Sequence, residues 1–337
     1  MGRQTDLTCA AARAAALELM SSAGRFVLCG HERPDGDCAG AQAALASVLE
    51  SLGKAVWIVN PDPLPSGLEH LTKTRRFEVL RGAELPPHDV AVLLDFSEPG
   101  RCGPLAGPLL AAASRKLVVD HHPCAHQPWW DAAYIDPGAA ATGLLVHRIA
   151  RELGARLDAA GALGVFTALA SDTGWFRYSN TDAEALSVAA ELVAGGLDPA
   201  GLYRQMYQRA GRERPLGIAR ALARLDYLAA GRLAVVDLPL PDAEEADLPE
   251  GDEVLDLLRA VESVEVALFL RETRSGSVHL SARAKGGCDV LGLARRFGGG
   301  GHSKASGATL PGPLVAARDA VVAAALEELG GRQGHTA

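Results

Sequence analysis

The sequence contains no long hydrophobic run and no excess of basic residues, and each absence excludes a class of function. No apolar run approaches the roughly 20 residues that a membrane-spanning helix needs, and the charged Arg3 and Asp6 precede no signal-like segment. The formal net charge of −8 argues against coating long DNA or RNA, which requires a basic surface. We therefore expect a cytoplasmic protein with neither a membrane nor a long duplex nucleic acid as partner, although a short nucleotide remains compatible.

The cysteines are few and scattered, without the close pairs of a zinc ribbon. Those beside the acidic motifs, Cys29, Cys38 and Cys124, could line a pocket or serve as small buried side chains. We expect reduced thiols at all six positions, which are Cys9, Cys29, Cys38, Cys102, Cys124 and Cys288.

The chain has 337 residues, of which 48% are hydrophobic, enough for more than one core. Strand-like and helix-like segments alternate in the first half, which predicts an α/β fold with a mainly parallel sheet covered by helices on both faces. After Gly231 the sequence turns β-rich, and it includes strand-like runs at 233–238, 264–271 and 277–284. We predict a catalytic domain over 1–195, a helical connector over 196–230 with a helix over 199–229 that is interrupted around Gly211, and a smaller α/β domain over 231–330. We expect the active site in the cleft between the domains.

Four acidic or histidine-containing stretches each follow an apolar run, namely HERPDGD at 31–37, LLDF at 93–96, VVDHH at 118–122 and ASDTG at 170–174. Three of them stand at the ends of predicted strands, where α/β sheets bind ligands. A ligand set of carboxylates and imidazole is better suited to Mn²⁺, Mg²⁺ or Fe²⁺ than to a structural zinc ion, which thiolates usually bind. The four stretches supply enough ligands for two divalent ions, which commonly catalyse substitution at phosphorus.

Each stretch also has a simpler interpretation. Asp37 could cap the helix that starts near Cys38, and Asp95 could belong to a turn. His121 and His122 could be an ordinary surface or core pair, and Asp172 could merely end a helix. The occurrence of all four in one chain favours the metal site.

A glycine-rich run, GGGGHSKASG at 298–307, marks the second domain. Glycine backbone N–H groups allow a phosphate to approach closely. A flexible loop would have the same composition.

Taken together, these motifs resemble those of the DHH superfamily of phosphoesterases, and the glycine-rich run resembles the DHHA1 domain. The resemblance covers about residues 20–310 and is strongest to NrnA-like oligoribonucleases and 3′-phosphoadenosine-5′-phosphate (pAp) phosphatases, a group that includes di-adenylate phosphodiesterases. It implies a homodimer and two divalent ions, with Mn²⁺ expected and Mg²⁺ or Co²⁺ as alternatives.

The resemblance also implies roles for individual residues. One ion would be held by His31, Asp35 and Asp95. The other would be held by Asp37, Asp95, His121 and Asp172, so that Asp95 bridges both. Asp120 would orient a histidine, and His122 would contact the scissile phosphate or assist the leaving oxygen, which makes Asp95, Asp120 and His122 the catalytic set.

In the second domain, the resemblance implies that Arg283 and His302 bind the terminal phosphate or base of the substrate. The glycines beside them would form part of the same site: Gly299, Gly300 and Gly301. The chain departs from the family pattern at Ala41 and Ala284, where serine is usual, and these departures affect substrate contacts rather than metal ligands.

Several activities fit this pattern. The first is hydrolysis of short RNA to nucleoside monophosphates, with removal of the 3′-phosphate of pAp as a second activity. The second is hydrolysis of cyclic or linear di-adenylate (c-di-AMP or pApA). A nucleotide-binding regulator without turnover is less favoured because no expected ligand is missing, and a RecJ-like exonuclease on long single strands is disfavoured by the acidic charge.

Overall fold

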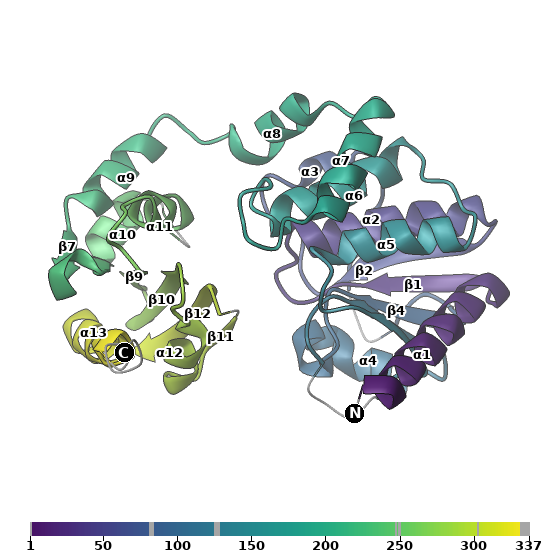
Figure 1. Cartoon of the computed structure of the whole chain (residues 1–337), viewed down its shortest axis with the longest axis horizontal. Helices are drawn as coiled ribbons and strands as arrows, with labels where there is room; N and C mark the ends of the chain where they lie inside the picture. The colour runs from purple at the N-terminus through teal and green to yellow at the C-terminus, as the bar shows by residue number, and fades with distance from the viewer. Residues whose placement is uncertain are drawn as a thin grey trace. The chain divides into compact units, whose positions relative to one another are not determined.

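The computed structural model describes residues 2–80, 84–124, 129–246, 248, 251–301 and 303–330. The chain divides into two compact units, Met1–Arg209 and Ala210–Ala337 (Figure 1). The segment expected as a helical connector is shared between them, since α8 (Pro199–Tyr207) lies in the first unit and α9 (Arg214–Leu222) in the second.

The prediction of a helix over 199–229 is wrong at the C-terminal end of that range. Leu225–Leu228 form strand β7, which pairs antiparallel with β8 (Leu233–Leu238). Pairing with a neighbouring strand outweighs local helix propensity here, because β propensity depends on such cross-strand contacts.

The first unit contains a six-stranded sheet in the order β3-β2-β1-β4-β5-β6, and every neighbouring pair is parallel. This confirms the predicted parallel sheet, although its two edge strands, β3 and β6, were not predicted. The strands are β1 (Arg25–Cys29), β2 (Ala55–Asn60), β3 (Phe77–Val79), β4 (Val90–Leu94), β5 (Arg115–Asp120) and β6 (Ala132–Ile135).

The strand order reverses at β1, which lies between β2 and β4. In open parallel sheets, such a switch point leaves a crevice beyond the carboxyl ends of the adjacent strands, and ligands bind there. The motifs that follow β1 and β4, together with the end of β5, are therefore placed at this edge of the sheet.

Helices cover both faces of this sheet, as predicted. Side chains alternate between the faces, so Leu28 packs in the core under the long helices and Val27 packs toward η1 (Pro99–Leu105) and α4 (Ala106–Ala111). Each large aliphatic side chain buried in this way contributes about 1.5–3 kcal/mol. The helices packed in the first core are α1 (Gly2–Ser22), α2 (Gly36–Ser51), α5 (Thr142–Glu152), α6 (Ala159–Asp172), α7 (Ala183–Ala194) and α8.

Helices α2 and α6 pack unusually closely because glycines face each other. A Cβ atom on Gly40 would lie 2.4 Å from the carbonyl oxygen of Gly164, and one on Gly164 would lie 2.6 Å from that of Gly40. The small residues let the two backbones approach, which places the end of α6 beside the start of α2.

The second unit is also α/β, as predicted, with a mixed sheet in the order β11-β12-β10-β9-β8-β7. Helices α12 (Val290–Arg296) and α13 (Leu314–Gly330) pack in the core on one face, while α9, α10 (Leu240–Ala246) and α11 (Asp252–Arg259) pack in the core on the other. The remaining strands are β9 (Val266–Glu272), β10 (Ser277–Ala284), β11 (Gly300–Gly301) and β12 (Ala305–Pro311).

Among the described residues, no single helix is long and apolar enough to cross a membrane. Helices α7 and α8 meet the length and composition criteria only as a pair, and they bend by 109° at the break between them.

Candidate metal centre

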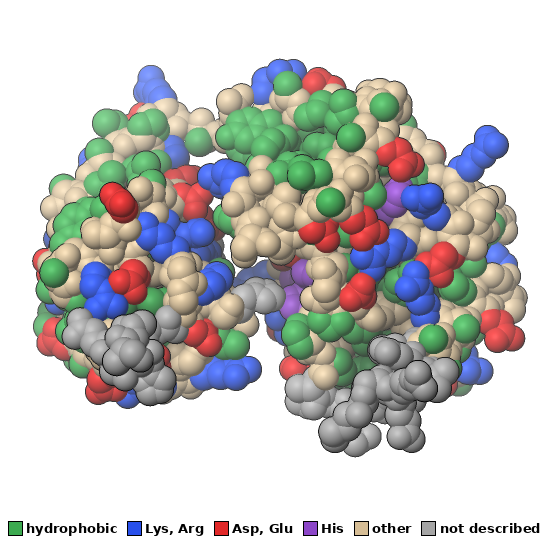
Figure 2. Space-filling view, viewed as in Figure 1, with side chains coloured by type: hydrophobic (Ala, Val, Ile, Leu, Met, Phe, Trp, Pro, Cys, Tyr) green, Lys and Arg blue, Asp and Glu red, His purple; other side chains and the backbone are tan. Residues whose placement is uncertain are grey.

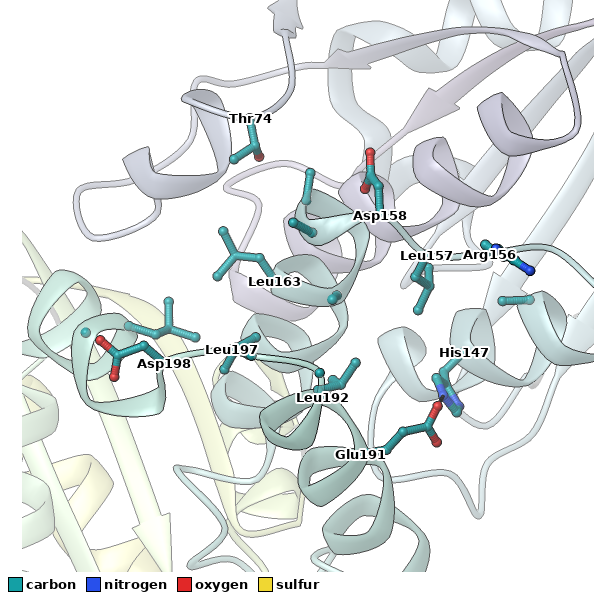
Figure 3. A pocket seen from close by; sticks show the side chains of 18 of the residues that line it. Thr74, His147, Arg156, Leu157, Asp158, Leu163, Glu191, Leu192, Leu197 and Asp198 are labelled. Atoms are coloured by element: carbon teal, nitrogen blue, oxygen red, sulfur yellow. Dashed lines mark ion pairs between the residues drawn. The ribbon is translucent and has the colours of Figure 1, made fainter.

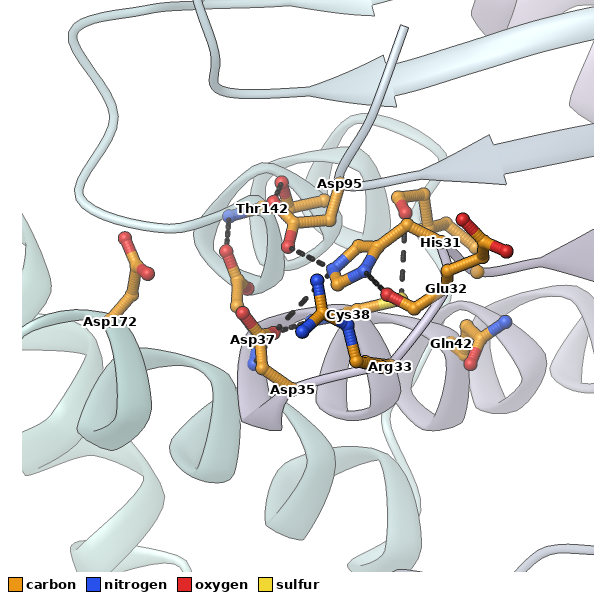
Figure 4. Close-up of polar contacts among 12 residues, drawn as sticks. His31, Glu32, Arg33, Asp35, Asp37, Cys38, Gln42, Asp95, Thr142 and Asp172 are labelled. Carbon is orange, nitrogen blue, oxygen red and sulfur yellow. Dashed lines mark hydrogen bonds and ion pairs between the residues drawn. The ribbon is translucent and has the colours of Figure 1, made fainter. Parts of the chain in front are cut away.

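His31 lies in the loop between β1 and α2, and its ring is almost completely buried. Its Nδ1 donates a hydrogen bond to the Glu32 carbonyl oxygen at 2.8 Å, which leaves Nε2 free to bind a cation. Nε2 lies 3.6 Å from Asp95 Oδ2 and 4.0 Å from Asp35 Oδ1 (Figure 4).

Asp35, rather than Asp37, caps helix α2. Its Oδ1 accepts hydrogen bonds from the backbone N–H groups of Asp37 and Cys38, both at 3.0 Å. The interpretation of Asp37 as the cap is therefore wrong, because Asp37 already lies in the first turn of the helix.

The side chain of Asp37, in the first turn of α2, is completely buried against the N-terminal end of α5. Its Oδ2 accepts a hydrogen bond from the Thr142 N–H at 2.7 Å, and its Oδ1 accepts one from the Gly143 N–H at 2.9 Å. Burial, with the neighbouring charge of Asp95, raises the pKa of Asp37 well above its ordinary value. The first-turn amides of α5 are contacts that the sequence motifs did not reveal.

Asp95 follows β4 in the left-handed backbone region, with φ of 68°, and it is buried. Its Oδ1 accepts a hydrogen bond from Thr142 Oγ1 at 2.9 Å and lies 3.6 Å from both His121 Nε2 and His122 Nδ1. Burial, with the charge of Asp35, raises the pKa of Asp95 well above its ordinary value. A carboxylate contacting three histidines in this way is suited to bridge two cations.

His121 presents a buried nitrogen with no hydrogen-bond partner. Its Nδ1 donates to the Ala139 carbonyl oxygen at 3.1 Å, whereas its Nε2 is unsatisfied. Nε2 lies 3.5 Å from an Asp172 oxygen and 3.6 Å from oxygens of Asp37 and Asp95. These separations exceed hydrogen-bond lengths but approach the ~3.0–3.5 Å between two ligands of one ion with bonds near 2.1 Å. The donor set therefore fits a divalent metal.

Asp172 is the last residue of α6, and the close packing of α2 and α6 brings it to this cluster. The side-chain amide of Asn180 donates to the Asp172 and Ala140 carbonyl oxygens, both at 3.1 Å, which fixes the following loop. Burial raises the pKa of Asp172, although the nearby charge of His121 partly opposes this.

Asp120 and His122 form a hydrogen-bonded pair beside the ligands. The buried Asp120 Oδ1 accepts from His122 Nδ1 at 2.8 Å and from the His122 backbone N–H at 3.0 Å. Burial would raise the pKa of Asp120, but the hydrogen bond and charge of His122 outweigh it, so the pKa is lowered. Burial likewise would lower the pKa of His122, but the hydrogen bond to Asp120 and the charge of Asp95 raise it. The His122 side chain is 29% exposed, against 10% for His121.

Among the described residues, three groups of side chains have potential ligand atoms within 4.8 Å of one another. All six predicted ligands occur in them, and Asp95 is shared by two groups. The groups are His31, Asp35 and Asp95; Asp37, His121 and Asp172; and Asp95, His121 and His122.

The predicted substrate residues lie in the second unit. Arg283, on β10, donates to Asp252 Oδ1 at 2.6 Å, and its position pairs with Ala305 on β12. Gly299 has no room for a side chain, since a Cβ there would lie 2.1 Å from the Gly307 carbonyl oxygen. Gly300 and Gly301 form β11, whereas His302 lies outside the described residues.

A separate cavity of about 850 Å³ lies at the far end of α6 (Figure 3). Its lining includes Leu163, Leu197 and the pair His147 and Glu191, whose Nε2 and Oε1 atoms are 3.5 Å apart. It reaches Asp158, the cap of α6, and the 14 residues of that helix span about 20 Å. The cavity is therefore distinct from the metal ligands.

Comparison with known families gives two matches. Residues 25–170 match the N-terminal domain of the DHH family, and residues 233–331 match the DHHA1 domain.

The chain is 34% identical over 309 residues to the bifunctional oligoribonuclease and PAP phosphatase NrnA of Thermus thermophilus, covering 91% of this chain and 90% of the relative. It is 23% identical over 314 residues to the cyclic-di-AMP phosphodiesterase GdpP of Bacillus subtilis, covering 88% of this chain but 47% of that protein.

Two solved structures share the fold. An exopolyphosphatase-related protein from Bacteroides fragilis has a TM-score of 0.85 at 23% identity and covers 96% of both chains. RecJ from Thermus thermophilus, in complex with Mn²⁺, has a TM-score of 0.52 at 16% identity and covers 94% of this chain and 53% of that one.

Proposed function

We propose that this chain, which belongs to the DHH family of phosphoesterases and carries a DHHA1 domain, hydrolyses short oligoribonucleotides to nucleoside monophosphates and removes the 3′-phosphate of pAp. Its Thermus relative, named as an oligoribonuclease and PAP phosphatase, supports both activities. The observation that carries the proposal is that the six predicted ligand side chains, which come from four separate motifs, lie together in groups that could hold metal ions.

The proposed cofactor is a pair of divalent cations, with Mn²⁺ favoured by the mixed carboxylate and imidazole donors. His31, Asp35 and Asp95 would hold one, and Asp37, Asp95, His121 and Asp172 the other. When bound, such a pair lowers the pKa of water and neutralises the charge of phosphoryl oxygens. The fixed Nδ1 hydrogen bonds of His31 and His121 support this assignment, since each leaves Nε2 directed at carboxylate oxygens.

His122 and Asp120 are proposed to handle the proton of the leaving group. As the oxygen of a water molecule adds to phosphorus and the P–O ester bond breaks, the leaving oxygen takes the proton of the His122 imidazolium. The proton that the water loses passes to solvent, from which His122 is protonated again. Asp120 supports the charged imidazolium through the 2.8 Å hydrogen bond to Nδ1 and so keeps the ring oriented. Arg283 and the 299–301 glycines would bind the substrate's terminal phosphate or base.

A direct assay tests the proposal. Purified full-length protein is incubated with di- to pentaribonucleotides and with pAp, each in Mn²⁺, Mg²⁺, Co²⁺ and EDTA, and the products are separated by chromatography. We expect mononucleotides and phosphate in the presence of metal. If no substrate is cleaved with any of these metals, the proposal is wrong.

A second candidate is hydrolysis of cyclic or linear di-adenylate, which the match to GdpP supports. The values of kcat/KM for c-di-AMP, pApA and a mixed-sequence dinucleotide separate the two. Near-equal values for the two dinucleotides would leave no preference for the signalling molecule. A nucleotide-binding regulator without turnover is disfavoured, because every metal-ligand residue expected from the family is present in the sequence. The expected homodimer is a separate prediction, which analytical sedimentation would test.

A further inference from the structure

An aromatic cluster begins three residues after Asp172 with the partly buried Trp175 and continues in two exposed tyrosines. The ring of Trp175 meets those of Tyr203 and Tyr207 edge-on, with centroids 4.9 and 5.7 Å apart, and the two tyrosines lie 5.2 Å from each other on α8. Tyr203 is 38% and Tyr207 47% exposed. We call these three residues the aromatic shelf, and Figure 2 shows hydrophobic side chains gathered over α8.

The Trp175 end of the shelf is held in place by its backbone conformation and by contacts with α6. Gly174, Trp175 and Phe176 have consecutive positive φ values of 55°, 59° and 62°, a conformation that aromatic residues rarely adopt. Phe166 packs edge-on against both Trp175 and Phe176, with centroids 5.9 and 5.7 Å away. Thr173 Oγ1 accepts the Phe176 N–H at 2.9 Å. Strained backbone that surrounding contacts enforce is typical of ligand-binding sites.

The shelf lies close to the proposed metal site. Three residues of chain span at most about 11 Å, so the Cα atom of Trp175 lies within that distance of the Cα atom of Asp172. Asn180 also donates a hydrogen bond to the Asp172 carbonyl oxygen, which holds the end of this loop beside Asp172. A strand bound at the metal ligands would need few additional nucleotides to reach the shelf.

The chemistry of the shelf matches single-stranded nucleic acid. Exposed tyrosine and tryptophan rings stack on bases of any sequence, and guanidinium groups beside them contact the phosphates. Arg177 follows Trp175 in the same loop and packs over the Tyr178 ring, and Arg204 lies next to Tyr203 on α8 with its side chain 64% exposed. Two guanidinium groups therefore neighbour the shelf along the chain, and that of Arg204 lies 3.9 Å from an oxygen of Asp198.

We infer that the aromatic shelf stacks the bases of a short RNA strand beyond its scissile phosphate, without reading their sequence. The inference rests on the proposed function and names its preferred substrate, a strand of several nucleotides rather than a single-base bisphosphate. A second copy of the chain fits less well, because two half-exposed tyrosines offer on the order of 200 Å² against about 800 Å² per partner in a stable interface.

The test compares three double or single variants in a binding assay that needs no catalysis. A fluorescently labelled penta-adenylate is titrated in EDTA with wild type, Tyr203→Ala/Tyr207→Ala, Tyr203→Phe/Tyr207→Phe and Tyr227→Ala, the last being a control at a 45% exposed tyrosine on β7. We expect the alanine pair to weaken binding about tenfold or more, while the phenylalanine pair and Tyr227→Ala keep wild-type affinity. A pentamer lacking its internal bases should bind wild type and the alanine pair alike.

Equal affinity of wild type and the alanine pair for penta-adenylate overturns the inference. So does a change from dimer to monomer in sedimentation with unchanged RNA affinity, which would make the shelf a subunit contact. Hydrolysis assays distinguish the two proposals. If wild type cleaves nothing but the alanine pair binds weakly, the proposed function fails and the shelf stands. If wild type cleaves the pentamer and the alanine pair binds it normally, only the shelf fails.

Discussion

Asp95 offers the most direct test at the scale of one residue, since its carboxylate faces His31, His121 and His122 at 3.6 Å. Asparagine tolerates its positive φ and can still accept from Thr142, so Asp95→Asn removes charge with little change of shape. We expect kcat/KM with Mn²⁺ to fall about 100-fold or more, since even groups that only support ligands commonly cost 10–100-fold.

The same substitution should stabilise the protein in EDTA at pH 8, by about 1–3 kcal/mol, because it removes a buried charge that repels its neighbours. Thermal unfolding of both proteins in EDTA measures this effect. Full activity of the variant would contradict the bridging role, and lower stability in EDTA would contradict the electrostatic argument.

Metal binding should stabilise the protein more at alkaline than at acid pH. Burial, with neighbouring charges, raises the pKa of Asp37, Asp95 and Asp172, so the folded metal-free protein takes up protons more readily than the unfolded chain. The contribution of these three groups to stability is therefore fully present below the ordinary aspartate pKa and is lost as the pH rises through their folded pKa values. The raised pKa values of His121 and His122 act in the same direction.

Metal ligands must be deprotonated, so Mn²⁺ relieves this repulsion only where the carboxylates are charged. We expect the rise in Tm caused by Mn²⁺ to be larger near pH 8 than near about pH 5.5. Scanning fluorimetry with Mn²⁺ or EDTA at both pH values measures it, with Asp95→Asn as the control that should respond little. An equal rise at both pH values would contradict the prediction.

Asp120 should set the alkaline limit of activity through His122. Its hydrogen bond raises the pKa of His122, so the imidazolium that serves as general acid persists to higher pH than an isolated histidine would. In Asp120→Asn this support is lost, and we expect the alkaline limb of the kcat profile to move to lower pH. A purely structural role of Asp120 would lower kcat at every pH without moving the limb.

At the scale of elements, the contact between α2 and α6 determines where Asp172 lies. We expect Gly40→Ala to cost about 1–3 kcal/mol, because the new methyl group would push into the backbone of α6. The shift should also weaken Mn²⁺ binding, measured by calorimetry. Gly107→Ala is the matched control, since Gly107 is a helical glycine of α4 whose Cβ would meet nothing within 4 Å. Equal stability and Mn²⁺ affinity of the two variants would refute this role.

The sequence was sufficient to predict the elements that deliver most ligands, because β1, β4 and β5 are short apolar runs that end at or within two residues of His31, Asp95 and Asp120. It did not predict the amides of Thr142 and Gly143 that bind Asp37. These contacts join segments about a hundred residues apart, and no local pattern marks them. The simpler interpretation named Asp37 as the cap instead of Asp35, because both carboxylates suit that position and the sequence does not distinguish them.

The aromatic shelf was missed for a different reason. Trp175 lies directly after a recognised motif, but its partners Tyr203 and Tyr207 belong to another helix. Aromatic residues with helical spacing usually belong to a core, and only the exposure of their rings indicates otherwise. Likewise, the expected cleft between the domains stays a prediction, since the motifs define each domain separately.

At the scale of the whole molecule, the division into two units predicts where a protease cuts first. Residues 207–213 are exposed and join α8 to α9. Beyond the end of α8, the backbone hydrogen bonds of this stretch within the described chain reach only three or four residues along the sequence, from Gln208 to Arg204, Arg214 to Gly211 and Gly217 to Glu213. Such stretches are the preferred sites of proteolysis. Arg212, whose side chain is 94% exposed, and Arg209 offer trypsin two sites.

We expect limited trypsin digestion to release two stable fragments that meet at Arg209 or Arg212, identified by mass spectrometry. Each has its own sheet and core, so both should resist further cleavage longer than the intact junction does. Replacing both arginines with glutamine should slow this first cut without changing the thermal unfolding of either unit, apart from the loss of the exposed Arg209–Glu69 ion pair, which contributes little. A first cut inside either unit would contradict this prediction. It would show that the part of the chain most accessible to protease lies within a unit and not at the junction between the two.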